Sequence, residues 1–198
     1  MNKIFIFITV AVFITGCSLK DVSKPIARYD VYSATKAKSK TRSDKVLRVA
    51  RFRTPANLFS KKIWYQREDM KTNSYLYSTW SLDFSTMIEQ QVANTLYASK
   101  LFKSVLSDYS KAKVDLVLEG EIVKAVQRVG TNGAEVVFEV RLYLINYKTS
   151  KLIGSKDFLY TKKCESVDAQ GAIKAYGKIM KIFNKEVILW LEKLVIKG

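Results

Sequence analysis

The sequence predicts an α+β protein in which an antiparallel β-sheet is covered on one face by two amphipathic helices. Three observations predict this fold. The middle of the chain alternates apolar and polar residues, a segment after residue 80 has an apolar residue at every fourth position, and the last segment has apolar residues at spacings of three and four. Alternation is the pattern of a half-buried strand, whereas the other two spacings are those of amphipathic helices.

Short strands are expected in the first third of the chain. Residues 28–32, 46–52, 63–67 and 75–77 are rich in aromatic and β-branched residues. The Ser/Thr-rich and basic segment 34–44 predicts a loop between the first two of these strands.

The first helix is expected to begin at Trp80-Ser81-Leu82-Asp83. Ser81 is a candidate cap for its first turn, and Asp83 lies near the positive end of the helix dipole. One face is apolar, with Phe84, Ile88, Val92 and Leu96 joined by Leu82 and Phe102, and the opposite face carries Glu89, Gln90 and Asn94.

Three consecutive antiparallel strands, a meander, are expected in the second half. Runs 116–122 and 136–144 flank Gly130-Thr131-Asn132-Gly133, and Asn-Gly is the strongest short hairpin signal. A turn at 148–150 leads to the third run, 151–160. A meander with one apolar face needs a cover, which the two helices provide.

The final helix is expected from Ala172 onward. Its opposite face is basic, and its apolar stripe has a seven-residue period. Two interpretations remain open: the stripe packs on the protein's own sheet, or it pairs with a partner helix as in a coiled coil. The stripe comprises Ile173, Tyr176, Met180, Phe183, Val187, Trp190 and Leu194, and the basic face Lys174, Lys178, Lys181, Lys185 and Lys193.

The N-terminus has the parts of a secretory signal. Lys3 precedes an apolar run from Ile4 to Ile14 that contains one threonine, and the run is shorter than the ~20 residues of a membrane-spanning helix. Ile14-Thr15-Gly16-Cys17 resembles a lipobox, the site at which bacterial lipoproteins are cut before a cysteine that carries acyl chains such as palmitate. The alternatives are an ordinary signal peptide with a chance cysteine and an uncleaved anchor.

The expected organisation is therefore a signal peptide over residues 1–16, a lipidated tether over 17–27 and a single α+β domain over 28–198. Cleavage before Cys17 leaves 198 − 16 = 182 residues, enough for one domain with a genuine core.

Composition argues against an enzyme. The chain has no histidine, which excludes Ser–His and Cys–His nucleophile pairs, and its 8 glycines form no phosphate-binding loop. If Cys17 is lipidated, Cys164 stands alone, so we expect a structural role for it and neither a metal nor a redox site. The sequence implies no cofactor.

The net charge of +16 indicates an anionic or acidic partner. Export argues against nucleic acid. The densest basic cluster lies near the lipid tether, where each cation close to an anionic headgroup layer contributes about 1 kcal/mol. The alternative is a solvated basic loop. The cluster comprises Lys36, Lys38, Lys40, Arg42 and Lys45.

A group of aromatic residues lies between residues 64 and 80. They are candidates for an apolar groove that contacts acyl chains or a partner, or for core and strand-edge positions. The group comprises Trp64, Tyr65, Tyr75, Tyr77 and Trp80.

These features together resemble the ABC-type transport auxiliary lipoproteins, the group that includes paraquat-inducible protein C. The resemblance rests on the lipobox, on Trp64-Tyr65-Gln66-Arg67 before a Tyr-Leu-Tyr, on Trp80 before a helix, and on the Leu-x-Gly-x-Ile of residues 118–122. The family's proline at the helix start is absent here. The resemblance covers nearly all of the mature chain.

The resemblance implies a lipoprotein anchored in the outer membrane and facing the periplasm. It also implies partnership with an ABC permease and ATPase and with a substrate-binding protein of the mammalian-cell-entry (MCE) type, in a system that moves phospholipid or other hydrophobic molecules. Ser18, directly after Cys17, is compatible with outer-membrane sorting. The alternatives are a structural or assembly lipoprotein of a secretion pore that forms homo-oligomers, and a protein that itself carries a lipid in an apolar cavity.

Overall fold

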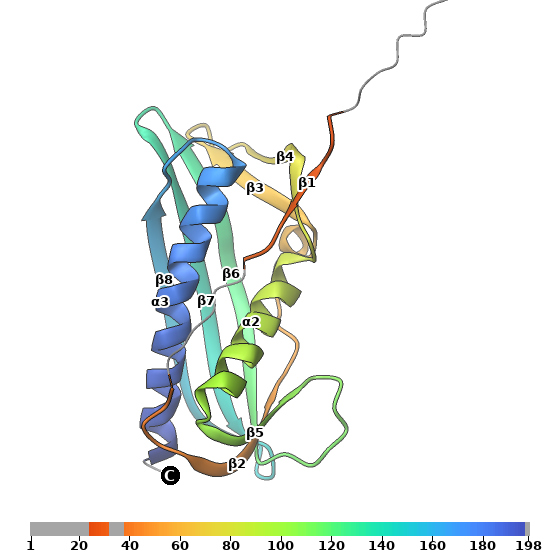
Figure 1. Ribbon diagram of the computed structural model, residues 1–198, viewed down its shortest axis with the longest axis vertical. Coiled ribbons are helices and arrows are strands. Elements are labelled where there is room, and N and C mark those ends of the chain that lie inside the picture. The colour runs from red at the N-terminus through yellow and green to blue at the C-terminus, as the bar shows by residue number, and fades with distance from the viewer. Residues whose placement is uncertain (1–23, 32–37, 197–198) are drawn as a thin grey trace, which may run out of the picture.

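The computed structural model describes residues 24–31 and 38–196, and it confirms the α+β class. One sheet of eight strands is covered on one face by two helices, α2 and α3, which run along the long axis of the molecule (Figure 1). The elements in chain order are β1 (Ala27–Tyr29), β2 (Ser43–Val49), the 3-10 turn η1 (Ala56–Leu58), β3 (Lys62–Arg67), β4 (Thr72–Trp80), α2 (Phe84–Ser99), β5 (Phe102–Ser107), β6 (Leu116–Gly130), β7 (Gly133–Asn146), β8 (Lys151–Lys163) and α3 (Ala169–Ile196).

The expected meander is confirmed as β6, β7 and β8, all antiparallel. The β6–β7 hairpin closes at the predicted Asn-Gly, where Gly133 has a φ of 116°, a conformation that favours glycine. At the β7–β8 turn, the side-chain oxygen of Asn146 accepts hydrogen bonds from the backbone N–H groups of Lys148 (3.0 Å) and Thr149 (3.2 Å).

The sheet is mixed rather than wholly antiparallel. The two short strands β2 and β3 both lie parallel to the long strand β6: Leu47 pairs with Leu116 near one end, and Tyr65 pairs with Gln127 near the other. β2 also pairs in parallel with β5, and β1 with β4. Alternation of apolar and polar residues reports which face a side chain takes but not the direction of the neighbouring strand, so the sequence did not reveal these parallel pairs.

The first helix begins later than the sequence predicted. Trp80 ends β4, and the N-cap of α2 is Asp83, whose carboxylate accepts a hydrogen bond from the backbone N–H of Thr86 at 3.3 Å. Ser81 instead donates to Asp30 and does not cap the helix. Glu89, expected on the polar face, is buried with 8% of its surface exposed, and this burial raises the pKa of its carboxyl.

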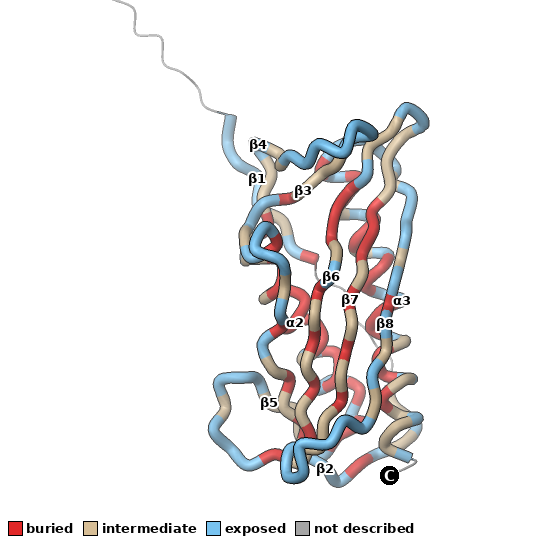
Figure 2. The backbone as a smooth tube through the Cα atoms, turned by 180° about the vertical axis from the view of Figure 1, so that it is seen from behind, coloured by how far each residue is buried: buried red, intermediate tan, exposed pale blue. Residues whose placement is uncertain are grey.

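The final helix packs on its own sheet. Asp168 accepts a hydrogen bond from the backbone N–H of Gly171 at 2.8 Å, so the helix begins three residues before the predicted start. Figure 2 shows the buried residues of α2 and α3 facing those of the sheet. The apolar stripe of α3 is directed inward: Tyr176, Met180, Phe183 and Val187 are each at most 2% exposed.

Candidate functional site

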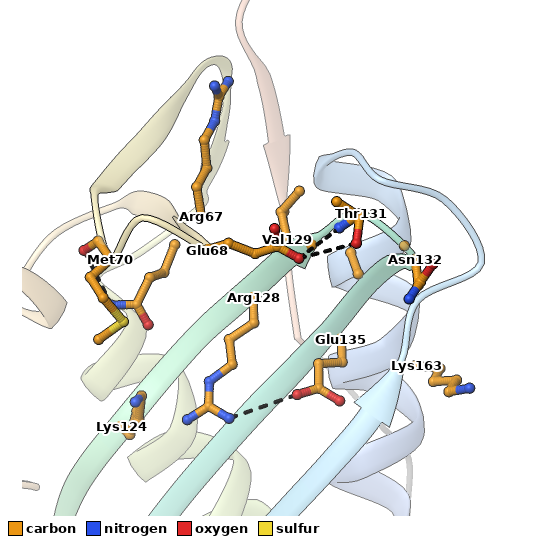
Figure 3. A pocket seen from close by; sticks show the side chains of 14 residues that line it. Arg67, Glu68, Met70, Lys124, Arg128, Val129, Thr131, Asn132, Glu135 and Lys163 are labelled. Atoms are coloured by element: carbon orange, nitrogen blue, oxygen red, sulfur yellow. Dashed lines mark hydrogen bonds and ion pairs between the residues drawn. The ribbon is translucent and has the colours of Figure 1, made fainter.

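A pocket lies at one end of the sheet, between the β3–β4 turn and the β6–β7 hairpin (Figure 3). Its volume is about 440 Å³. Glu68, in the β3–β4 turn, connects the two turns. Its carboxylate accepts hydrogen bonds from the backbone N–H (2.9 Å) and the hydroxyl (3.3 Å) of Thr131 in the β6–β7 hairpin. The pocket wall also includes Gln66, Met70, Lys124, Arg128 and Glu135.

The wall of this pocket carries more cations than carboxylates, and both of its carboxylates have partners. Arg128 pairs with Glu135 at 3.7 Å, and both side chains are more than a third exposed. In Figure 3 the Arg67 side chain points away from this pair. Because both carboxylates are already engaged and open to water, the pocket has the geometry of a solvated surface rather than of a catalytic cleft. Sequence reasoning did not anticipate it, since its walls come from turns far apart in the chain.

Beneath the pocket, a buried polar network joins the sheet to the start of α3. Gln127, which is fully buried, accepts a hydrogen bond from the Tyr75 hydroxyl at 2.6 Å and donates to the backbone oxygen of Asp168 at 3.2 Å. Its amide also lies 3.5 Å from the sulfur of Cys164. Burial raises the pKa of Tyr75 to about 12 and raises the pKa of the Cys164 thiol. Both groups are therefore neutral at pH 7, and a neutral thiol is a poor nucleophile.

The five aromatic residues singled out in the sequence occupy three environments. Trp80 is in the core, 2% exposed, against Phe84 and Tyr176. Tyr65 and Tyr75 contact each other with ring centroids 4.9 Å apart, and the Trp64 indole donates to the backbone oxygen of Asn57 at 2.7 Å. Tyr77 is half exposed, with the Lys24 ammonium 5.5 Å from its ring centroid. A role for these five in binding stays a prediction.

The basic segment before β2 lies against the C-terminal half of α3. The carboxylate of Glu192 accepts hydrogen bonds from the Ser39 hydroxyl and, at 3.0 Å, from the backbone N–H of Lys40. The side chains of Lys38, Lys40 and Arg42 are exposed beside it. The basic segment and the basic side of α3 are thus brought together by a contact between residues 152 apart in the sequence. We call the resulting surface the basic face; its members on α3 are Lys178, Lys181, Lys185 and Lys193. Sequence reasoning identified both sets of cations but not their contact.

One acidic residue partly neutralises the basic face near the start of α3. Glu165 accepts hydrogen bonds from the ammonium groups of Lys174 (3.0 Å) and Lys178 (2.7 Å), and these two cations lower the pKa of its carboxyl to about 2. The excess positive charge therefore lies further along the helix.

Cys17 and Lys36 lie outside the described residues, so their predicted roles in lipidation and in surface contact stay predictions. In the ranges 24–31 and 38–196 no helix has the length and hydropathy to cross a membrane, and no cluster of acidic or sulfur side chains suits a metal ion.

No protein-family model matches the sequence, and no curated protein matches it. Solved structures match the fold. A crystal structure of protein XCC0632 from Xanthomonas campestris, described with the family model DUF330, aligns over 86% of this chain and 97% of its own, with a TM-score of 0.79 and 14% identity. A second crystal structure, of an uncharacterized protein, covers 84% of this chain and 99% of its own (TM-score 0.65, 12% identity).

A third match is protein CT253 from Chlamydia trachomatis, which covers 79% of this chain and 100% of its own, with a TM-score of 0.53 and 10% identity. At these identities the likeness establishes a shared fold. The alignments cover most of each chain.

Proposed function

We propose that the protein is a non-enzymatic, membrane-anchored accessory lipoprotein of an ABC transport system of the MCE type, which moves phospholipid or other hydrophobic molecules across the bacterial envelope. Cys17 carries the acyl chains that hold the protein in the outer membrane, and the folded domain faces the periplasm. There it docks the MCE-type substrate-binding protein that works with the ABC permease and ATPase.

The observation that carries the proposal is the combination of a lipobox with a single domain whose exposed chemistry is that of a binding surface. Two carboxylates of the meander region have partners within the protein: Asp115 accepts a hydrogen bond from the backbone N–H of Val46 at 2.9 Å, and the carboxylate of Glu121 lies 3.8 Å from the Arg141 guanidinium. The cations gather on one face instead, which suits electrostatic recognition of a partner. The resemblance to the transport auxiliary lipoproteins supplies the kind of partner.

The anchor is tested by growing cells that express the full-length chain with an alkyne analogue of palmitate. We expect the wild-type protein to incorporate the label and to sediment with outer membranes. Cys17→Ser removes the acceptor thiol, so its label should fall to background. Cys164→Ser is the matched control, since it removes the other cysteine of the chain and should leave labelling unchanged. Full labelling of Cys17→Ser would contradict lipidation at this residue.

A further inference from the structure

The outer side of α3 carries a second apolar stripe, distinct from the one that packs on the sheet. Ile182, Leu189 and Ile196 are 46%, 45% and 63% exposed. Residues seven apart lie nearly in line on a helix, so the three side chains form a row about 21 Å long. Exposed aliphatic residues in such a row favour the seating of another helix along it.

Lysines border this row. Lys181, Lys185 and Lys193 are exposed, and none has an acidic partner within 4.0 Å among the residues that the structure describes. Glu192, which lies on the same side of the helix, is already engaged by Ser39 and Lys40. The row is therefore apolar in its centre and has an uncompensated positive border.

The row lies far from the end at which the anchored chain enters the domain. Figures 1 and 2 both place β1 in the half of the molecule that holds the β3–β4 turn, whereas α3 ends at the opposite end. The helix has 28 residues and is about 42 Å long. The seven residue-to-residue steps from Cys17 to Lys24 can span at most about 25 Å. An anchor at Cys17 thus holds the other end of the domain to the membrane.

From these observations we propose that the row formed by Ile182, Leu189 and Ile196 docks an amphipathic helix of a partner protein, with an acidic border around its own apolar stripe. Carboxylates of that helix would meet Lys181, Lys185 and Lys193, while its apolar side chains cover the row. A second copy of this chain is a poor occupant, because two such faces would place lysines opposite lysines. The inference deepens the proposed function by naming the docking face and the chemistry of its partner.

The test is site-specific photocrosslinking of the full-length chain in its own membranes. A photoreactive phenylalanine analogue replaces Leu189, and mass spectrometry identifies the peptide attached after irradiation. The control carries the same analogue at Tyr97, which is 60% exposed on α2. We expect position 189 to attach a peptide of another protein that has a net negative charge and apolar residues at helical spacing, and position 97 to attach none.

Charge-reversal variants test the electrostatic part. Lys181→Glu, Lys185→Glu and Lys193→Glu together should lower the yield of the adduct about tenfold, since three attractive contacts at the border become repulsive. Lys111→Glu with Lys113→Glu, in the exposed loop after β5, changes the net charge in the same direction and should leave the yield unchanged. Unchanged yield in the α3 variant would overturn the charge complementarity.

Three other outcomes would overturn the proposal: an adduct with lipid, an adduct with a second copy of the chain, or no adduct above that at position 97. Its failure is distinguishable from failure of the proposed function. If the transport proteins co-purify with the lipoprotein but position 189 attaches none of them, the function stands and the docking face is elsewhere.

Discussion

Replacing Phe183 with alanine is expected to lower the free energy of unfolding by about 4 kcal/mol. Phe183 is fully buried on α3, and its ring centroid lies 5.6 Å from that of Phe138 on β7 and 5.3 Å from that of Phe158 on β8. Removal of the ring leaves a cavity between the helix and two strands of the meander. The two strands are held in register by their β7–β8 hydrogen-bonded ladder, so they cannot readily move inward to fill the space.

Urea unfolding of the wild type and of Phe183→Ala, followed by circular dichroism, measures this loss. Phe59→Ala is the matched control: Phe59 is 58% exposed, so its removal should change the free energy of unfolding by about 0.5 kcal/mol or less. If both variants lose the same free energy of unfolding, the contact between α3 and the sheet is not the centre of the core.

Replacing Gly120 with alanine is expected to lower the free energy of unfolding by about 1–3 kcal/mol. A Cβ at Gly120, in the first half of β6, would lie 2.6 Å from three atoms of the Phe52 ring, closer than real Cβ atoms approach their neighbours. Phe52 is 2% exposed, so its ring has no free space into which to move. The glycine is needed here because an aromatic ring packs directly on the strand backbone.

Gly177→Ala is the control for this substitution. A Cβ at Gly177 meets nothing within 4 Å, and alanine is favoured over glycine inside a helix, so this change should be neutral or stabilising by up to about 1 kcal/mol. Adding Phe52→Leu to Gly120→Ala should recover part of the loss, since a smaller side chain relieves the contact. If the double variant instead loses the sum of the unfolding free energies that the two single variants lose, the steric explanation is wrong.

The strongest periodic signals of the sequence predicted the fold well. The Asn-Gly hairpin, the meander and both helices appear where alternation and four-residue spacing placed them, since these patterns report directly which side chains a strand or helix buries. The predicted start of the first helix, at Trp80, was wrong. Ser81 and Asp83 are both good capping residues, and the choice between them depends on tertiary packing. β5 was missed because Phe102 also continued the apolar spacing of α2.

Less of the candidate binding surface could be predicted. The lysines of α3 were evident, but the row of Ile182, Leu189 and Ile196 was hidden by the longer stripe that faces the sheet. Only the packing of α3 shows which of the two stripes stays exposed. The contact of Glu192 with Ser39 likewise depends on a chain path that no local pattern encodes.

Isolation of the full-length lipoprotein from crosslinked membranes, with identification of the co-purified proteins by mass spectrometry, tests most directly whether it belongs to a transport complex. The proposed function predicts recovery of an MCE-type protein together with its ABC permease and ATPase. Recovery of the protein alone, as a ladder of homo-oligomers, would contradict that function and favour a structural or assembly lipoprotein of a secretion pore.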